Sequence, residues 1–179
     1  LPEKIIAILK KEGIVSLNPP QVAAVKKGLF NGKSLVIASP TASGKTLIAE
    51  MAILKNFLDG RKAVYLVPLK ALASEKYEDF KKYKKIGMKV GIATGDLDSN
   101  DGWLGSSDLI ILSNEKMDSL LRHGVPWLKD VSLIVSDEVH VIDDAYRGPT
   151  LEIVLTQLAS LTKSQIIALS ATIKNAEEL

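Results

Sequence analysis

The chain has 179 residues, of which 46% are apolar, and its formal net charge is only +2. This length and apolar content predict one domain with a well-buried core, and the small charge neither supports nor excludes nucleic-acid binding. The absence of cysteine excludes disulfide bonds and cysteine-based zinc sites. No apolar run approaches the roughly 20 residues of a membrane span, so we expect a cytoplasmic protein with no membrane partner.

Strand-like and helix-like patterns alternate along the whole chain. Continuous apolar runs such as residues 109–112 are typical of strands covered on both faces, as in a parallel sheet. Apolar positions recur at helical spacing in segments 47–58 and 151–158, and Asn18 before Pro19 predicts the start of another helix. The predicted strands cover residues 34–39, 63–67, 89–94, 108–113, 133–137 and 166–170. This alternation predicts an α/β fold with a mostly parallel sheet and helices on both faces.

A phosphate-binding loop is predicted where the first strand meets the following helix. The loop ends in Gly-Lys-Thr, and backbone N–H groups of such a loop and helix start point at bound phosphates. Lys45 would reach the β- and γ-phosphates, and the Thr46 hydroxyl would be a ligand of Mg²⁺. The first glycine of the usual pattern is replaced by serine, and the alternative is a plain helix-capping turn, which the strand and helix flanks disfavour. The predicted nucleotide-binding residues of the loop are Ser39, Pro40, Thr41, Ala42, Ser43, Gly44, Lys45 and Thr46.

A second motif, which is acidic, lies at the end of the strand predicted at residues 133–137. Asp137 and Glu138 stand at its end, which is what a magnesium-dependent ATPase needs opposite a phosphate loop. Asp137 would hold Mg²⁺ through water, and Glu138 would orient or deprotonate the attacking water. The metal-binding pair is therefore Thr46 and Asp137.

The basic segment 81–85 is interpreted as the end of a helix rather than as a nucleic-acid patch, because lysines there complement the helix dipole. Glu78 lies four residues before Lys82, a spacing that supports a solvated helix face.

Several short motifs together resemble the first motor domain of superfamily 2 helicases of the DExH-box type. Residues 137–140 read Asp-Glu-Val-His, like the DExH box, and residues 170–172 read Ser-Ala-Thr, like motif III. Residues 147–152 resemble the Ski-like branch and, within it, the archaeal Holliday-junction-migration (Hjm-type) DNA helicases. The other motifs resembled, in chain order, are the Q-motif region (18–21), motif I (39–46), motif Ia (68–72), motif Ib (94–96) and a nucleic-acid-contacting helix (113–122). Ala42 and Asn114 depart from the pattern, but neither replaces a charged group.

This resemblance implies a RecA-like P-loop domain over residues 1–179, the first of two motor domains, with the second absent from this chain. It implies an ATP-dependent 3′-to-5′ DNA helicase that acts on forks or branched DNA in DNA repair, with ATP and Mg²⁺ as cofactors. An archaeal source would add association with the nucleoid. Because the second domain of such enzymes supplies arginine fingers that stabilise transition-state charge, we expect this chain alone to bind nucleotide weakly and to hydrolyse little or none.

The resemblance also assigns roles to single residues. Gln21 would read the adenine edge, and its alternative role is a hydrogen bond at the helix start. His140 would couple the nucleotide and nucleic-acid sides together with Ser170 and Thr172, whose alternative role is to cap a turn. The catalytic residues implied are Lys45, Asp137, Glu138 and His140. The residues implied in nucleic-acid contact are Pro68, Lys70, Thr94, Gly95 and Arg122, and the alternative for Lys70 and Arg122 is a solvated surface charge.

Three other classes of protein remain as alternatives. An RNA helicase of the same branch would share all of these motifs. A P-loop kinase or other small NTPase would share the phosphate loop but would not need the Ser-Ala-Thr motif. A non-catalytic binding module is disfavoured because Lys45, Thr46, Asp137 and Glu138 are all intact.

Overall fold

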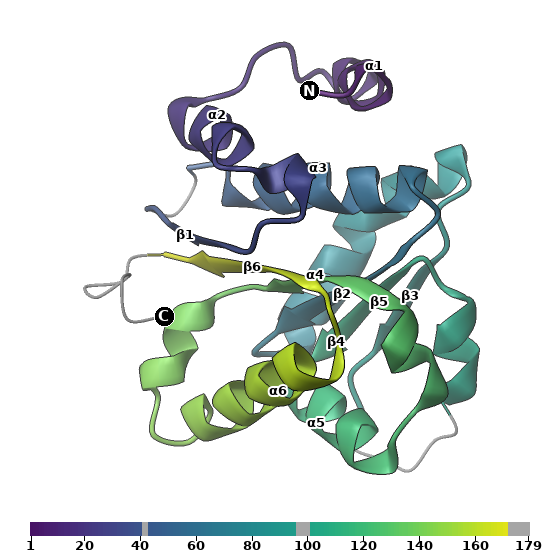
Figure 1. Cartoon of the computed structure of the whole chain (residues 1–179), viewed down its shortest axis with the longest axis vertical. Helices are drawn as coiled ribbons and strands as arrows, with labels where there is room; N and C mark the ends of the chain where they lie inside the picture. The colour runs from purple at the N-terminus through teal and green to yellow at the C-terminus, as the bar shows by residue number, and fades with distance from the viewer. Residues whose placement is uncertain (41–42, 96–100, 172–179) are drawn as a thin grey trace.

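The computed structural model of the chain describes residues 1–40, 43–95 and 101–171 (Figure 1). The α-helices are α1 (Glu3–Lys11), α2 (Pro19–Lys26), α3 (Lys45–Leu58), α4 (Lys70–Lys81), α5 (Asn114–His123) and α6 (Gly148–Leu161). Short 3₁₀ helices are η1 (Leu29–Asn31), η2 (Lys82–Ile86), η3 (Asp101–Ser106), η4 (Pro126–Asp130) and η5 (Val139–Asp143). The strands are β1 (Leu35–Ala38), β2 (Lys62–Val67), β3 (Val90–Ala93), β4 (Leu109–Ser113), β5 (Val131–Ser136) and β6 (Gln165–Ser170).

The strands form one parallel sheet in the order β1-β6-β5-β2-β4-β3. Each strand lies within two residues of its predicted range at either end, and the two predicted helical segments fall in α3 and α6. The prediction of a RecA-like α/β domain with a parallel sheet is confirmed.

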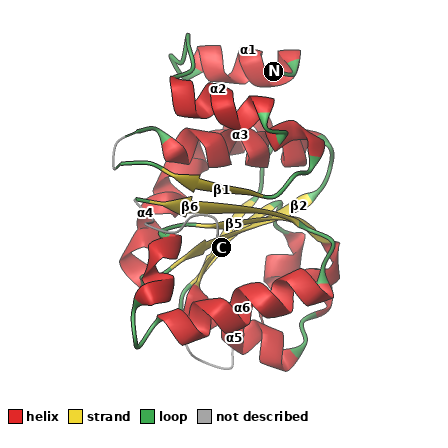
Figure 2. Ribbon diagram, turned by 60° about the vertical axis from the view of Figure 1, so that its left-hand side comes forward, coloured by secondary structure: helices red, strands yellow, loops and turns green. Residues whose placement is uncertain are grey.

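Helices cover both faces of the sheet, as Figure 2 shows: α1, α2 and α3 are stacked over one face, and α5 and α6 lie under the other. The sequence of β2 is continuously apolar because the strand is buried on both faces. Tyr65 and Val67 belong to the cluster on the α3 side, whereas Val64 and Leu66 belong to the cluster on the α5 and α6 side. Because successive side chains of a strand point to opposite faces, a strand buried on both faces needs an apolar residue at every position.

Helix α2 begins as its sequence predicts. The Asn18 side chain accepts a hydrogen bond from the backbone N–H of Gln21, and the Gln21 side chain accepts one from the backbone N–H of Asn18. Pro19 occupies the first helical position, where its missing N–H leaves no partner unsatisfied.

The basic segment lies at the end of a helix, as predicted. Helix α4 ends at Lys81 and the next lysines form η2. Glu78 pairs with Lys81, whereas Lys82 pairs with Glu50 of α3 at 2.8 Å. Lys82 therefore lies beyond the end of the α-helix, and its ammonium reaches a neighbouring helix.

Helix α6 approaches η5 so closely that its first residue has to be glycine. A Cβ on Gly148 would lie 2.1 Å from the backbone carbonyl oxygen of Ile142, and a backbone atom cannot move aside as the tip of a side chain does. We expect Gly148→Ala to lower the free energy of unfolding by at least about 2 kcal/mol, as overpacking at a rigid contact does. Urea denaturation followed by circular dichroism measures this change.

Gly95→Ala is the matched control, because no atom lies within 4 Å of a Cβ at that position and its φ is not positive. Its free energy of unfolding should change by no more than about 0.5 kcal/mol. Equal losses at positions 95 and 148 would contradict the packing explanation.

In the ranges that the structure describes, no helix is both long enough and apolar enough to cross a membrane.

Candidate nucleotide site

The predicted phosphate loop, the predicted coupling residue Ser170 and the predicted metal-binding residue Asp137 lie at the carboxyl ends of three neighbouring strands, β1, β6 and β5. Ser39 follows β1, Ser170 ends β6 and Asp137 follows β5. Since β6 lies between β1 and β5 in the sheet, the phosphate loop and the Asp-Glu motif flank Ser170. Ligands of open parallel sheets bind at this edge, outside the carboxyl ends of the strands.

The phosphate loop is held in shape by its own lysine and hydroxyl groups. Gly44 has a φ of 79°, a left-handed conformation that favours glycine, and α3 begins directly after it. The Lys45 ammonium donates hydrogen bonds to the carbonyl oxygens of Ser39 and of Pro40, the latter at 3.0 Å. The Ser39 and Ser43 hydroxyls are hydrogen-bonded to each other. Lys45 therefore lies folded over the loop that is expected to bind phosphate.

Thr46 is the second residue of α3, so its hydroxyl stands in the first turn of the helix beside the loop. Thr41 and Ala42 lie outside the residues that the structure describes, as does Thr172.

The start of α2 is tied to the phosphate loop by two side-chain amides. Asn18 donates from Nδ2 to the carbonyl oxygen of Ser43 at 2.7 Å, and Gln21 donates from Nε2 to the carbonyl oxygen of Gly44 at 3.1 Å. A Cβ on Gly44 would lie 2.4 Å from Gln21 Nε2, so the tie also requires glycine there.

These contacts bear on the role predicted for Gln21. Its Nε2 is bonded to Gly44 and its Oε1 accepts from the Asn18 N–H at 2.9 Å, so both groups of the amide have partners within the fold. The alternative role at the helix start is therefore realised. Recognition of adenine by Gln21 stays a prediction. The second N–H of Nε2 and the second lone pair of Oε1 are the groups that would serve it. The contact of Asn18 with the loop was not predicted, since the sequence marks Asn18 only as a helix cap.

The carboxylate of Asp137 is largely buried and hydrogen-bonded on both oxygens. Tyr65 donates its hydroxyl to Oδ2 at 2.7 Å, and the backbone N–H of Glu138 donates to Oδ1 at 3.0 Å. Lys76 Nζ lies 3.9 Å from Oδ2. Burial raises the pKa of Tyr65 well above its usual value, and the neighbouring Asp137 carboxylate raises it further, so the phenol keeps its proton and acts as a donor.

Glu138 has an unusual backbone. Its φ is 53°, and it is the only residue other than glycine with a positive φ in the described part of the chain. Such a conformation costs free energy and persists where the surrounding structure imposes it. It places Glu138 Oε2 at 3.2 Å from His140 Nδ1, with both side chains partly exposed. The structure thus brings Glu138 and His140 together next to the buried Asp137.

The residues predicted to contact nucleic acid fall mostly on the other half of the same sheet edge. Pro68 follows β2 and Lys70 begins α4, where its side chain is exposed, while Thr94 and Gly95 follow β3. Arg122 differs, because it stands near the far end of α5, which begins at the end of β4. Eight residues of helix correspond to about 12 Å, so Arg122 lies away from the edge, and its guanidinium pairs with Asp118.

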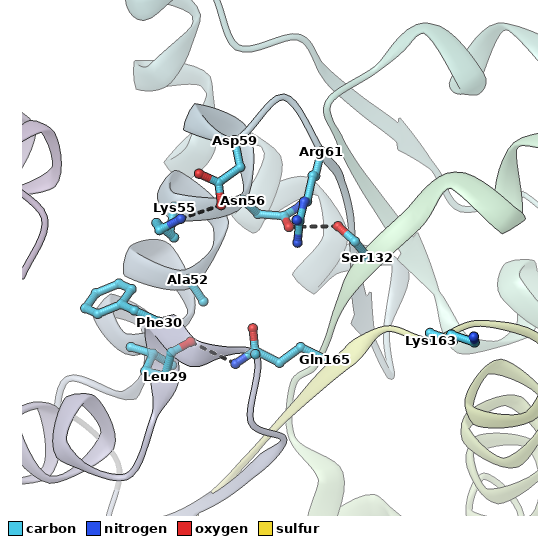
Figure 3. A pocket seen from close by; sticks show the side chains of 11 residues that line it. Leu29, Phe30, Ala52, Lys55, Asn56, Asp59, Arg61, Ser132, Lys163 and Gln165 are labelled. Atoms are coloured by element: carbon cyan, nitrogen blue, oxygen red, sulfur yellow. Dashed lines mark hydrogen bonds and ion pairs between the residues drawn. The ribbon is translucent and has the colours of Figure 1, made fainter.

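The pocket drawn in Figure 3 lies at the opposite edge of the sheet, near the amino ends of β2, β5 and β6. Ser132 there donates to Asn56 Oδ1 at 2.8 Å, and Gln165 Nε2 donates to the Leu29 carbonyl oxygen at 2.9 Å. Since the predicted residues gather at the carboxyl ends, this pocket is separate from the candidate site.

A phosphate loop and an acidic strand end at the carboxyl edge of one parallel sheet define a nucleotide-binding domain of the P-loop class. Comparison with protein families narrows the class. The family model described as DEAD/DEAH box helicase matches residues 18–179, and the chain belongs to this family. The resemblance of the motifs to superfamily 2 helicases is confirmed.

Proteins of similar sequence bear this out. The ATP-dependent DNA helicase Hel308 of Thermococcus kodakarensis is 56% identical over 178 residues, which are 99% of this chain and 16% of that protein. Hel308 of Pyrococcus horikoshii is 56% identical over 99% of this chain and 25% of its own length. Hel308 of Methanocella arvoryzae is 54% identical over 100% of this chain and 25% of its own length. The chain thus spans a quarter or less of the length of these relatives.

A solved structure shares the fold. The helicase Lhr of Mycobacterium smegmatis, bound to single-stranded DNA and AMP-PNP, matches 97% of this chain and 25% of its own with a TM-score of 0.80 and 26% identity.

Proposed function

We propose that this chain is the ATP-binding motor domain of an ATP-dependent DNA helicase. The observation that supports this most directly is the placement of the phosphate loop and of Asp137-Glu138 at the carboxyl ends of β1 and β5, on either side of β6. Both halves of an ATPase site then face one edge of a rigid sheet. The chain covers a quarter or less of the length of these relatives. A protein of their length therefore has room for a second motor domain, which would complete the site.

The donor set of the site fits a magnesium nucleotide. Gly44 brings no side chain to the point where the loop approaches Gln21, and Lys45 supplies a cation within the loop. The Thr46 hydroxyl and the Asp137 carboxylate are hard oxygen ligands of the kind that Mg²⁺ prefers. Bound Mg²⁺ would neutralise charge on the β- and γ-phosphates. No cluster of three or more candidate metal ligands occurs among the described residues, and Mg²⁺ sites of this type need only one or two protein groups beside phosphates and water.

Each catalytic side chain has a task that its position supports. Lys45 exchanges its bonds to Ser39 and Pro40 for bonds to phosphate oxygens. Glu138 accepts a proton from the attacking water or orients it. His140 Nδ1 lies 3.2 Å from Glu138 Oε2, and a proton on this nitrogen would let the ring hold the direction of the carboxylate. Ser170 is fully buried, and its hydroxyl has no hydrogen-bond partner within the described ranges. Its place between the two halves of the site supports the proposed coupling role.

The finer parts of the proposal concern the whole protein. We infer DNA rather than RNA as its substrate because the relatives are named DNA helicases. For the whole protein we also propose translocation from 3′ to 5′, action on forks or branched DNA, a role in DNA repair and a location in the cytoplasm, as the resemblance of the motifs implies. One DNA strand would contact the residues that follow the carboxyl ends of β2 and β3, which are Pro68, Lys70, Thr94 and Gly95.

ATP turnover by this chain, with and without single-stranded DNA, tests the proposal together with titration of a fluorescent nucleotide. We expect this chain to bind nucleotide in a magnesium-dependent way with little or no turnover. A longer protein that joins this domain to a second motor domain should show turnover that DNA stimulates. Absence of nucleotide binding would refute the proposal. Stimulation of the longer protein by single-stranded RNA but not DNA would favour the RNA helicase instead.

A further inference from the structure

Strand register brings Tyr65 of β2 close to Asp137, which follows β5. Tyr65 of β2 is paired with Val135 of β5. Asp137 stands two residues beyond Val135 and therefore points to the same face of the sheet. The contact between the Tyr65 hydroxyl and Asp137 Oδ2, at 2.7 Å, joins residues that are 72 positions apart in the chain.

Packing alone does not explain a tyrosine at this position. The Tyr65 side chain is fully buried in a strand whose neighbouring residues are apolar, and its ring packs against Phe80 at 5.5 Å between centroids. Phenylalanine would fill the same space without a polar group that must find a partner in the interior. The hydroxyl is therefore the part of Tyr65 that packing does not require, and its partner is the acidic residue of the candidate site.

The remaining contacts of Asp137 fix the carboxylate in one orientation. Oδ2 faces the interior, with the Tyr65 hydroxyl as donor and Lys76 Nζ at 3.9 Å, while Oδ1 accepts from the Glu138 N–H at 3.0 Å. Lys76 comes from α4 and is itself nine-tenths buried. Oδ2 is thus engaged from within the fold by two side chains, whereas Oδ1 accepts from a single backbone donor.

We propose that Tyr65, supported by Lys76, is a positioning residue that holds Asp137 ready for the Mg²⁺ of a bound nucleotide. This inference rests on the proposed function, since it presumes that Asp137 serves that ion. Partners that orient a metal-binding carboxylate are worth about tenfold or more in metal affinity. The Tyr65 hydroxyl should therefore affect nucleotide binding only when Mg²⁺ is present.

The test compares the dissociation constant of a fluorescent ADP analogue with and without Mg²⁺ in wild type and in Tyr65→Phe. We define the magnesium effect as the ratio of the two constants. Tyr65→Phe should reduce the magnesium effect by about tenfold and leave the affinity without Mg²⁺ unchanged. Lys76→Met removes the ammonium and keeps the apolar stem. This variant should also reduce the magnesium effect, but by a smaller factor.

Tyr83→Phe is the matched control. Tyr83 is a second fully buried tyrosine in the same aromatic row, with its ring 6.2 Å from that of Phe80, but it lies in η2. It should leave both dissociation constants unchanged. Thermal unfolding by circular dichroism shows whether each variant is folded under the conditions of the titration.

Asp137→Asn separates a role through Asp137 from a general structural role. If Tyr65 acts through this carboxylate, Tyr65→Phe should have no further influence on the magnesium effect in the Asp137→Asn background. A further loss in that background, or an unchanged magnesium effect in Tyr65→Phe alone, would overturn the inference while the proposed function stands. A wild-type chain without any magnesium effect would instead count against the proposed function itself.

Discussion

Replacement of Lys45 by alanine is expected to weaken nucleotide binding by at least about 100-fold, because the phosphates lose a charge-assisted donor that nothing nearby replaces. The structure explains why the loss should be this large. The Lys45 ammonium already lies over the loop on the carbonyl oxygens of Ser39 and Pro40, so little reorganisation is needed before it meets a phosphate. Titration of a fluorescent nucleotide in the presence of Mg²⁺ measures the effect.

Lys55→Ala provides a control on the same helix. Lys55 stands near the end of α3 remote from the loop, and its ammonium pairs with Asp59. This variant should bind nucleotide as the wild type does. Nucleotide affinity that survives in Lys45→Ala would contradict the assignment of the phosphate loop.

Replacement of Glu138 by glutamine is expected to slow ATP hydrolysis by the longer protein by about 100-fold or more, the typical contribution of a general base. Nucleotide binding should persist, because glutamine keeps the shape of the side chain and Glu138 is not expected to touch the phosphates. Steady-state turnover with single-stranded DNA, set beside nucleotide titration of the same variant, measures the two effects separately.

Glu78→Gln removes a carboxylate of the same type from the exposed face of α4, where Glu78 pairs with Lys81. It should leave turnover unchanged. Near-normal hydrolysis by Glu138→Gln would show that another group activates the water, and the role proposed for Glu138 would then be wrong.

Features with a local cause could be predicted from the sequence. Continuous apolar runs identified central strands such as β2 and β4, because a strand buried on both faces needs apolar residues throughout. Asn18 and Pro19 marked the start of α2 because capping depends on residues only three positions apart. The phosphate loop was predicted for the same reason, since its glycine and lysine are adjacent in the chain.

Contacts between distant segments had no signal in the sequence. Tyr65 was counted only as part of an apolar run, because nothing local reveals that β2 and β5 are neighbours in the sheet. Asn18 was assigned as a cap, although its amide also holds the phosphate loop. Arg122 was grouped with the nucleic-acid residues by motif alone, and the direction of α5 places it away from the edge.

The sequence by itself therefore determined the class of fold, the family and the chemistry available at the phosphate loop and at Asp137-Glu138. Short-range patterns set by backbone geometry and by the order of residues are enough for these. Only the tertiary structure decided which buried residues contact the Asp137 carboxylate from the interior of the fold. The order of the strands and the packing of α4 on the sheet bring Tyr65 and Lys76 to Asp137, and such contacts depend on the complete fold.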